Sequence, residues 1–210
     1  MTVATDNFTG SNDTELSAYS ANWSKLTGGD MDNELYIQDN ALGVDNADAS
    51  DTQAAYWWNA VSFAERQYAQ ARVISQDASG GYHGLVVRGS GTANGNCYLY
   101  FVDDSDAGYI DRVTSGTATN LSSAGSVVSN NDVIRFEAEG INLRVYINGE
   151  LDFAITNSSH ATGSPGVGGF GNTSAGSPTP DTQIDDWEGG DSWIDIKNTP
   201  GNKSVQIVTP

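Results

Sequence analysis

Apolar and polar side chains alternate with a period of two along most of the chain. Within residues 65–75, Ala69, Ala71 and Val73 share one face, opposite polar and aromatic side chains. This period predicts half-buried β-strands, and no stretch has the pattern of an amphipathic helix. Similar strand-like runs occupy residues 33–44, 54–58, 84–89, 97–102, 108–113, 132–140, 142–149, 150–156, 166–171 and 182–190.

Turn signals separate these runs and suggest a fold class. The pairs Gly80-Gly81, Asn94-Gly95 and Asn148-Gly149 fall between runs, as does Gly140. Ten or more short strands with such punctuation predict an all-β protein, a two-sheet antiparallel sandwich or jelly roll. We expect one domain over residues 1–190. Residues 191–210, which follow a Gly-Gly stop, are expected to form a C-terminal extension and an assembly or anchoring hairpin.

Charge excludes some partners. The chain has 27 acidic and nine basic residues and a formal net charge of −18. Nucleic acid and anionic membranes are therefore not expected as partners, because both require basic surfaces. The single cysteine, Cys97, permits no intrachain disulfide and is expected in the core. Neither a secretion signal nor an apolar run long enough to span a membrane is seen, so we expect a protein made in a cytoplasm and either kept there or exported within a larger object.

The order of several motifs resembles a known superfamily. These motifs are "DNF" (Asp6–Phe8), "ANW" (Ala21–Trp23), "LYIQDNAL" (Leu35–Leu42), "VIRFEAEGINLRVYINGEL" (Val133–Leu151), "PGVGGFG" (Pro165–Gly171) and "IDDWEGGD" (Ile184–Asp191). Together they resemble the concanavalin A-like lectin/glucanase superfamily, and within it the laminin G-like jelly rolls of polysaccharide-active and bacteriophage virion proteins. The resemblance covers about residues 6–190. It implies two curved sheets with adjacent terminal strands, and Phe8 and Trp187 closing one end of the core.

Glucanases of this superfamily carry three acids, Glu-x-Asp-x-x-Glu, on one strand. Glu150 and Asp152 match the first two positions, but Ile155 occupies the third, where the general acid would stand. Retaining hydrolysis needs two suitably placed carboxyl groups. Because the Asn148-Gly149 turn also precedes Glu150 directly, we interpret the segment as a hairpin strand and expect no catalysis and no catalytic residues.

Other candidate chemistry is weaker. Glu137 and Glu139 share a face with Arg135, which indicates a charged solvent face. The two histidines, His83 and His160, match no catalytic motif and are expected in loops. No cofactor is expected. A structural calcium ion is compatible with three acidic clusters, although none matches an EF-hand and no ligands can be assigned: Asp30/Asp32/Glu34, Asp45/Asp48/Asp51 and Asp103/Asp104/Asp106.

Aromatic and arginine side chains form the candidate binding set. Flat rings suit the C–H faces of sugars, and guanidinium groups donate to hydroxyl or carboxylate groups. Most of the set falls on what we take to be the non-core phase of its strands, although core or oligomer-interface positions are an equal alternative. The glycan-binding candidates are Tyr36, Trp57, Arg72, Arg88, Tyr98, Tyr100, Arg144 and Tyr146; Trp58 belongs to the same group.

The sequence therefore predicts a non-catalytic jelly-roll surface protein. We expect a virion component, in a capsid decoration, tail or fibre, that contacts other virion or assembly proteins through residues 191–210. A cell-surface glycan and a second copy of the chain are further candidate partners. The alternative is a polysaccharide-active enzyme, a hydrolase or lyase, or the extracellular carbohydrate-binding module of one.

Overall fold

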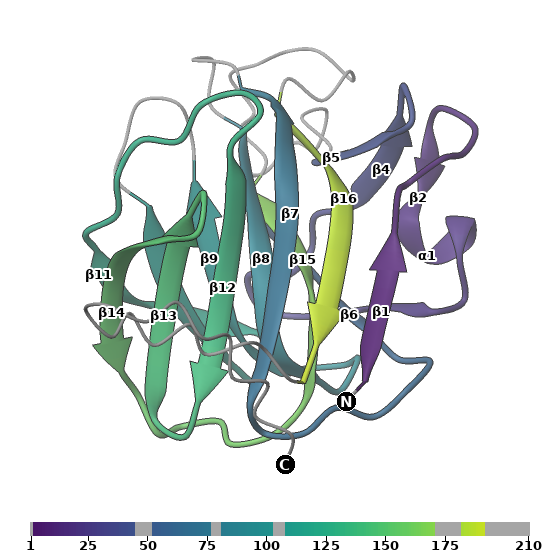
Figure 1. Ribbon diagram of the computed structural model, residues 1–210. Helices are drawn as coiled ribbons and strands as arrows, with labels where there is room; N and C mark the ends of the chain where they lie inside the picture. Colours follow the sequence, from purple (N-terminus) through teal and green to yellow (C-terminus); the bar gives the residue numbers. More distant parts are fainter. Residues whose placement is uncertain (1, 45–51, 77–80, 103–107, 171–181, 192–210) are drawn as a thin grey trace.

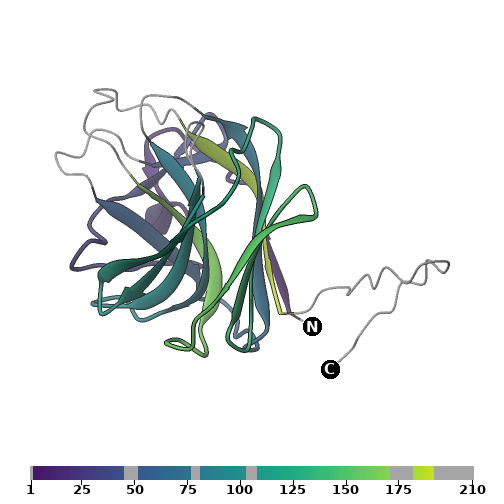
Figure 2. The same ribbon diagram turned by 90° about the vertical axis from the view of Figure 1, so that its left-hand side faces the viewer.

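The computed structural model describes residues 2–44, 52–76, 81–102, 108–170 and 182–191. Within them the chain forms two antiparallel sheets packed face to face (Figures 1 and 2). The first sheet has nine strands, in the order β14 (Glu150–Thr156), β13 (Asn142–Ile147), β12 (Val133–Glu139), β7 (Gln67–Ser75), β16 (Gln183–Gly190), β5 (Ala41–Val44), β4 (Leu35–Gln38) and β2 (Thr14–Glu15), with β1 (Val3–Asp6) paired to β16.

The second sheet has seven strands among the described residues. Their order is β11 (Thr117–Ser123), β10 (Tyr109–Thr114), β9 (Asn96–Val102), β8 (Tyr82–Ser90), β15 (Ser164–Phe170), β6 (Gln53–Trp58) and β3 (Trp23–Lys25). The expected all-β jelly-roll sandwich is confirmed. The one described helix, α1 (Leu16–Tyr19), is a single turn, and in the described parts of the chain no helix is long and apolar enough to cross a membrane.

The two ends of the domain meet, as the resemblance implies. β1 runs antiparallel to β16, with Asp6 opposite Trp187. Phe8 and Trp187 are both buried in the core between the sheets, and both rings contact Trp23, at centroid distances of 6.1 and 4.7 Å. A buried aromatic side chain removes about 150–250 Å² from water, so each ring contributes roughly 4–6 kcal/mol before ordering entropy is subtracted.

Two hairpins form where the sequence places them. Asp39 and Asn40 connect β4 to β5, and Asn148 and Gly149 connect β13 to β14. All four residues have the positive φ that a type I′ turn requires, between 53° and 82°. β14 lies at the edge of its sheet, as Figure 1 shows, and Glu150 is exposed there.

The other two positions of the glucanase-like motif have structural contacts. Asp152 accepts hydrogen bonds from the backbone N and Oγ of Ser126, at 2.9 and 2.6 Å. These bonds connect the loop between β11 and β12 to β14. Ile155 packs against the core.

The expectation that Tyr98 and Tyr100 face away from the core is wrong. Both are fully buried between the sheets, whereas Cys97 and Leu99 point to the opposite face of β9. That outer face is also covered, because Leu26 and Met31 pack on it and form a second apolar cluster. Alternation therefore separates two faces of β9, but both faces are buried.

The histidines divide between a strand and a loop. His160 lies in the loop after β14, as expected. The expectation for His83 is wrong, because it sits within β8 and is 3% exposed. Both of its ring nitrogens are buried and have no hydrogen-bond partner in the described structure. Since burial disfavours the charged imidazolium, it lowers the pKa of His83 to about 3.

The C-terminal boundary of the sheet lies close to the expected one. β16 ends at Gly190, and Asp191 accepts hydrogen bonds from the backbone N of Thr2 and of Ala64, at 2.6 and 3.3 Å. The expected extension beyond Asp191 lies outside the described residues, so its anchoring role stays a prediction. The same holds for the acidic clusters Asp45/Asp48/Asp51 and Asp103/Asp104/Asp106.

In the remaining acidic cluster, Asp30/Asp32/Glu34, two carboxylates make contacts within the fold. Asp30 accepts a hydrogen bond from the backbone N of Ala118 at 2.7 Å, and Glu34 pairs with Lys25. No group of three or more His, Cys, Asp or Glu side chains placed to hold a metal ion occurs among the described residues.

Candidate functional site

A bulge in β16 shapes the surface where β1 pairs with β16. The register of β16 against β7 shifts between Asp185 and Glu188, and Asp186 has a φ of 52°. A bulge bends its strand and redirects side chains locally. Here Trp187 is buried in the core, whereas Asp186 is exposed and Glu188 is half-buried.

Asp6, the last residue of β1, joins three segments of chain. Its carboxylate accepts hydrogen bonds from the Tyr19 hydroxyl at 2.9 Å, the Trp23 indole Nε1 at 3.0 Å and the Phe8 backbone N at 2.9 Å. Burial, followed by the hydrogen bond to Asp6 and its charge, raises the pKa of Tyr19 to about 12. Tyr19 therefore keeps its proton at neutral pH and donates it to Asp6.

Two tryptophan rings lie beside this carboxylate. Trp58 and Trp187 stack with their centroids 5.5 Å apart, at an interplanar angle of 26°. The Trp187 Nε1 donates to the Gly166 carbonyl at 3.2 Å. The Nε1 of Trp58, by contrast, is buried and has no hydrogen-bond partner in the described part of the chain.

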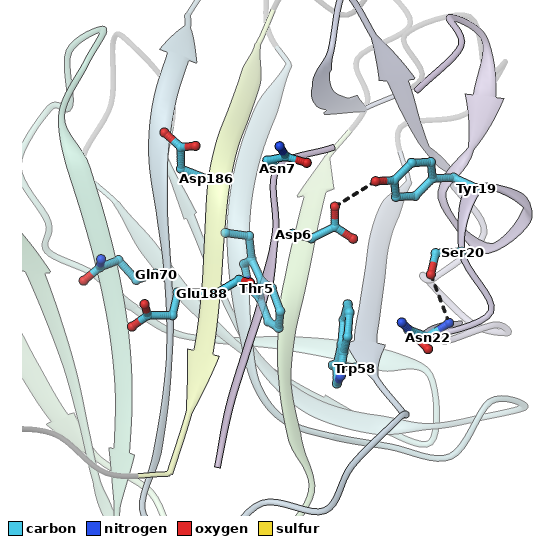
Figure 3. Close-up of a pocket in the computed structure, with 11 residues that line it drawn as sticks. Thr5, Asp6, Asn7, Tyr19, Ser20, Asn22, Trp58, Gln70, Asp186 and Glu188 are labelled. Atoms are coloured by element: carbon cyan, nitrogen blue, oxygen red, sulfur yellow. Dashed lines mark hydrogen bonds between the residues drawn. The ribbon is translucent and has the colours of Figure 1, made fainter. Parts of the chain in front are cut away.

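These elements enclose an open groove of about 670 Å³, shown in Figure 3. One side carries Gln70, Asp186 and Glu188 from β7 and β16, and the other carries Tyr19 and residues just after α1. The volume falls in the range of small-molecule sites, which run from about 300 to 1,000 Å³. Its lining residues are Thr5, Asp6, Asn7, Tyr19, Ser20, Asn22, Trp58, Gln70, Asp186, Trp187 and Glu188.

One sequence-predicted binding residue borders the groove. The Arg72 Nε lies 2.8 Å from the Asp186 Oδ2, and its Nη2 lies 3.5 Å from the Asp185 Oδ2. Burial, and secondarily the charges of Asp186 and Asp6, raise the pKa of Asp185. Arg72 thus holds the bulge of β16 in place from the neighbouring strand.

The other seven sequence-predicted binding residues do not gather around this groove. Tyr36, Arg144 and Tyr146 occupy half-buried positions on the nine-stranded sheet, and Trp57 packs against the second apolar cluster of the other sheet. Tyr98 and Tyr100 are in the core. The expected glycan surface built from all eight residues is therefore not formed, because their strands belong to different sheets and present different faces.

Arg88 is buried rather than available to a ligand. Its side chain is 1% exposed, and its guanidinium donates to the carbonyls of His160, Gly140 and Glu65, at 2.6, 2.7 and 3.3 Å. The residue has a φ of 57° within β8. Its placement on a solvent-facing strand position is thus wrong, because β8 has a bulge between Val87 and Ser90 and the Arg88 side chain is directed toward three loop carbonyls.

Most of the residues that line the groove were not predicted as binding residues from the sequence, although several of them belong to the motifs that carry the resemblance. Asp6 and Asn7 belong to "DNF", and Asp186 and Glu188 belong to "IDDWEGG". Both motifs were interpreted only as core-closing segments. The signal that could have located the groove was the expected pairing of the terminal strands, which places the polar residues of the two motifs on a common surface.

Fold and groove together define a class: a two-sheet antiparallel jelly roll with an open groove whose lining combines tryptophan side chains with carboxylates and amides. No protein-family model matches the chain, and no relative was found among curated proteins. The family is therefore not defined by sequence, and the class rests on the structure.

Solved structures share the fold at low sequence identity. A carbohydrate-binding module from Bacillus subtilis is 17% identical, with a TM-score of 0.56, over 79% of this chain and 91% of that one. The β-glucanase of Bacillus licheniformis is 10% identical, with a TM-score of 0.57, over 91% and 98%. The potassium-bound carbohydrate recognition domain of Emp46p is 10% identical, with a TM-score of 0.52, over 90% and 96%. These likenesses show that the chain has the jelly-roll fold of these carbohydrate-binding and glucanase structures.

Proposed function

We propose that this protein is a non-catalytic carbohydrate-binding jelly roll whose ligand occupies the groove between β1, β16 and the segment after α1. The observation that carries the proposal is the composition of the groove: the edge of the Trp58 ring, which stacks on the buried Trp187, lies beside carboxylate, amide and hydroxyl groups. Sugars present apolar C–H faces and a ring of hydroxyls, so they need both kinds of partner. Carbohydrate-binding structures of the same fold support this reading.

A binding experiment on the groove tests the proposal. Asp186→Asn should weaken binding to the preferred oligosaccharide about three- to tenfold, because a charge-assisted acceptor contributes about 1 kcal/mol more than a neutral one. Asp13→Asn is the matched control: Asp13 is exposed, has a φ of 60° and lies outside the groove, and its change alters the net charge equally. Affinities would be measured by calorimetry across a panel of oligosaccharides. Equal losses in both variants would count against the groove.

Polysaccharide hydrolysis is the second candidate function, and one pair of residues favours it. Asp185 has a raised pKa and stands directly before Asp186, which is paired with Arg72. A carboxyl group whose burial raises its pKa, standing next to a second carboxyl group, is a candidate general acid. Asp185 is not among the residues that line the groove, however, and Asp186 is already bound by a guanidinium. The observations therefore support binding better than cleavage.

Turnover assays distinguish the two functions. We expect no release of reducing ends from β-glucans or acidic polysaccharides, and we expect Glu150→Gln to leave oligosaccharide affinity unchanged, because Glu150 is exposed on an edge strand. Depolymerisation that is abolished by Asp185→Asn would establish the hydrolase instead. Depolymerisation abolished by Glu150→Gln would restore the glucanase-like strand as the active site.

The wider setting is a further part of the proposal. We propose that the jelly roll is displayed on a larger assembly, a virion capsid, tail or fibre, with residues beyond Asp191 contacting neighbouring proteins. The support is the motif resemblance alone. An extracellular carbohydrate-binding module attached to an enzyme is the alternative setting, and the proteins that copurify with the chain distinguish them.

A further inference from the structure

The groove has an unusual charge balance for a sugar site. Among the described residues, its lining includes the carboxylates of Asp6, Asp186 and Glu188 and no lysine, arginine or histidine. Asp185, which precedes Asp186 in the chain, adds a fourth carboxylate next to the groove. Arg72 pairs with Asp185 and Asp186. Four carboxylates against one guanidinium leave a local excess of negative charge, within a chain whose formal net charge is already −18.

The groove's carboxylates keep acceptor positions for a ligand. The Tyr19 hydroxyl is committed as a donor to Asp6, and the Tyr68 hydroxyl donates to Glu188. An ionised carboxylate has about four lone-pair positions, so Glu188 and Asp186 keep acceptor sites after their observed contacts. These acceptors lie beside amides and hydroxyls that can both donate and accept, and they suit a ligand that donates.

The negative field reaches groups near the groove. The charges of Asp186 and Asp6 contribute to the raised pKa of Asp185, and those of Asp6 and Asp185 contribute to the raised pKa of Tyr19. A cleft lined by charge of one sign concentrates oppositely charged ligands and repels like charges. The carboxylate of a uronic acid bound here would be repelled by the carboxylates of the groove.

The aromatic wall gives an independent reason to place a donor-rich ligand here. Trp58 is 8% exposed and lines the groove, and indole faces attract cations as well as sugar C–H groups. Trp187 stacks on Trp58 but is only 1% exposed, so it supports Trp58 from the core side. A sugar bearing an ammonium group can contact the exposed part of Trp58 and the carboxylates at once.

We infer that the groove selects glycans that carry protonated amino groups over neutral glycans, and excludes uronic-acid glycans. This inference rests on the proposed carbohydrate binding and names the substrate class of the same site. The recognised chemistry is a pyranose with an ammonium substituent, as in a β-1,4-linked glucosamine oligomer. Asp186 and Glu188 contact the ammonium group, and Asp6, whose oxygens already accept three hydrogen bonds, keeps the surrounding segments in place.

A matched pair of ligands tests the inference. Glucosamine oligomers and cello-oligomers share the β-1,4 linkage and differ at C2, where an amine replaces a hydroxyl. At a pH that keeps the amines protonated and the protein folded, calorimetry should give about three- to fivefold tighter binding of the glucosamine oligomer, as expected for one partly exposed ion pair. Added salt should reduce this advantage, since it screens the charges. Oligogalacturonate should not bind.

Variants locate the effect. Asp186→Asn and Glu188→Gln should each lower the affinity for the glucosamine oligomer about three- to fivefold more than that for the cello-oligomer, whereas Asp13→Asn should lower neither. Equal affinity for the two oligomers would overturn the charge selection and leave carbohydrate binding standing. Binding that persists with every oligomer in both groove variants would overturn it as well. If no oligosaccharide binds, the proposed function itself fails.

Discussion

Arg88→Met is expected to lower the free energy of unfolding by about 3–5 kcal/mol. The guanidinium is the donor to three carbonyls, those of Glu65, Gly140 and His160, which belong to three separate loops. Methionine fills similar volume but donates nothing, and each of these part-buried carbonyls that loses its donor costs about 1–3 kcal/mol. Denaturant titration monitored by tryptophan fluorescence measures the change.

Two further variants separate the loss of the three hydrogen bonds from the general effect of replacing an arginine. Arg88→Lys keeps the charge but cannot reach three carbonyls with one compact ammonium, so it should recover only part of the stability. Arg112→Met is the matched control, because the hydrogen bonds of the Arg112 side chain to Ser159 and Thr119 are long, at 3.4 and 3.5 Å, and exposed. A loss no greater than that of Arg112→Met would show that the buried guanidinium does not hold the loops.

Acid is expected to destabilise the domain through His83. Its pKa is about 3 in the folded protein and about 6.5 when unfolded. Above pH 6.5 the ring is neutral in both states and has no effect on the pH dependence. Between pH 6.5 and 3 the unfolded chain binds a proton that the folded protein does not, so stability falls as the pH falls, by about 1.4 kcal/mol per unit. The total loss approaches 4–5 kcal/mol near pH 3.

His83→Leu removes this contribution and should flatten the stability profile over the same range. Carboxylates also titrate toward the acid end, so the measured quantity is the difference between the wild-type and variant profiles from denaturant titrations at several pH values. His160→Gln is the comparison variant, because the half-buried His160 ring contacts the Val113 carbonyl at 2.7 Å. Parallel profiles for the wild type and His83→Leu would contradict the assignment.

Much of the architecture follows from local pattern. Period-two alternation predicted most strands, and the Asp39-Asn40 and Asn148-Gly149 pairs predicted two hairpins that the structure confirms. These signals are strong because each depends on neighbouring residues only: pleating alternates side chains, and a type I′ turn needs two residues that tolerate positive φ. Short strands without alternation, β2 (Thr14–Glu15) and β3 (Trp23–Lys25), carry no such signal and were not predicted.

Local patterns in the sequence predict the fold class and the two hairpins, and the resemblance implies the closure of the core by Phe8 and Trp187. Tertiary structure decided which faces are covered: Tyr98 and Cys97 lie on opposite faces of β9, and both are buried because Leu26 and Met31 come from a distant segment. It also created the groove, which joins residues 5–7 to residues 186–188 through the pairing of β1 with the bulged β16. Alternation specifies the two faces of a strand, but what lies against each face depends on contacts between residues far apart in the chain.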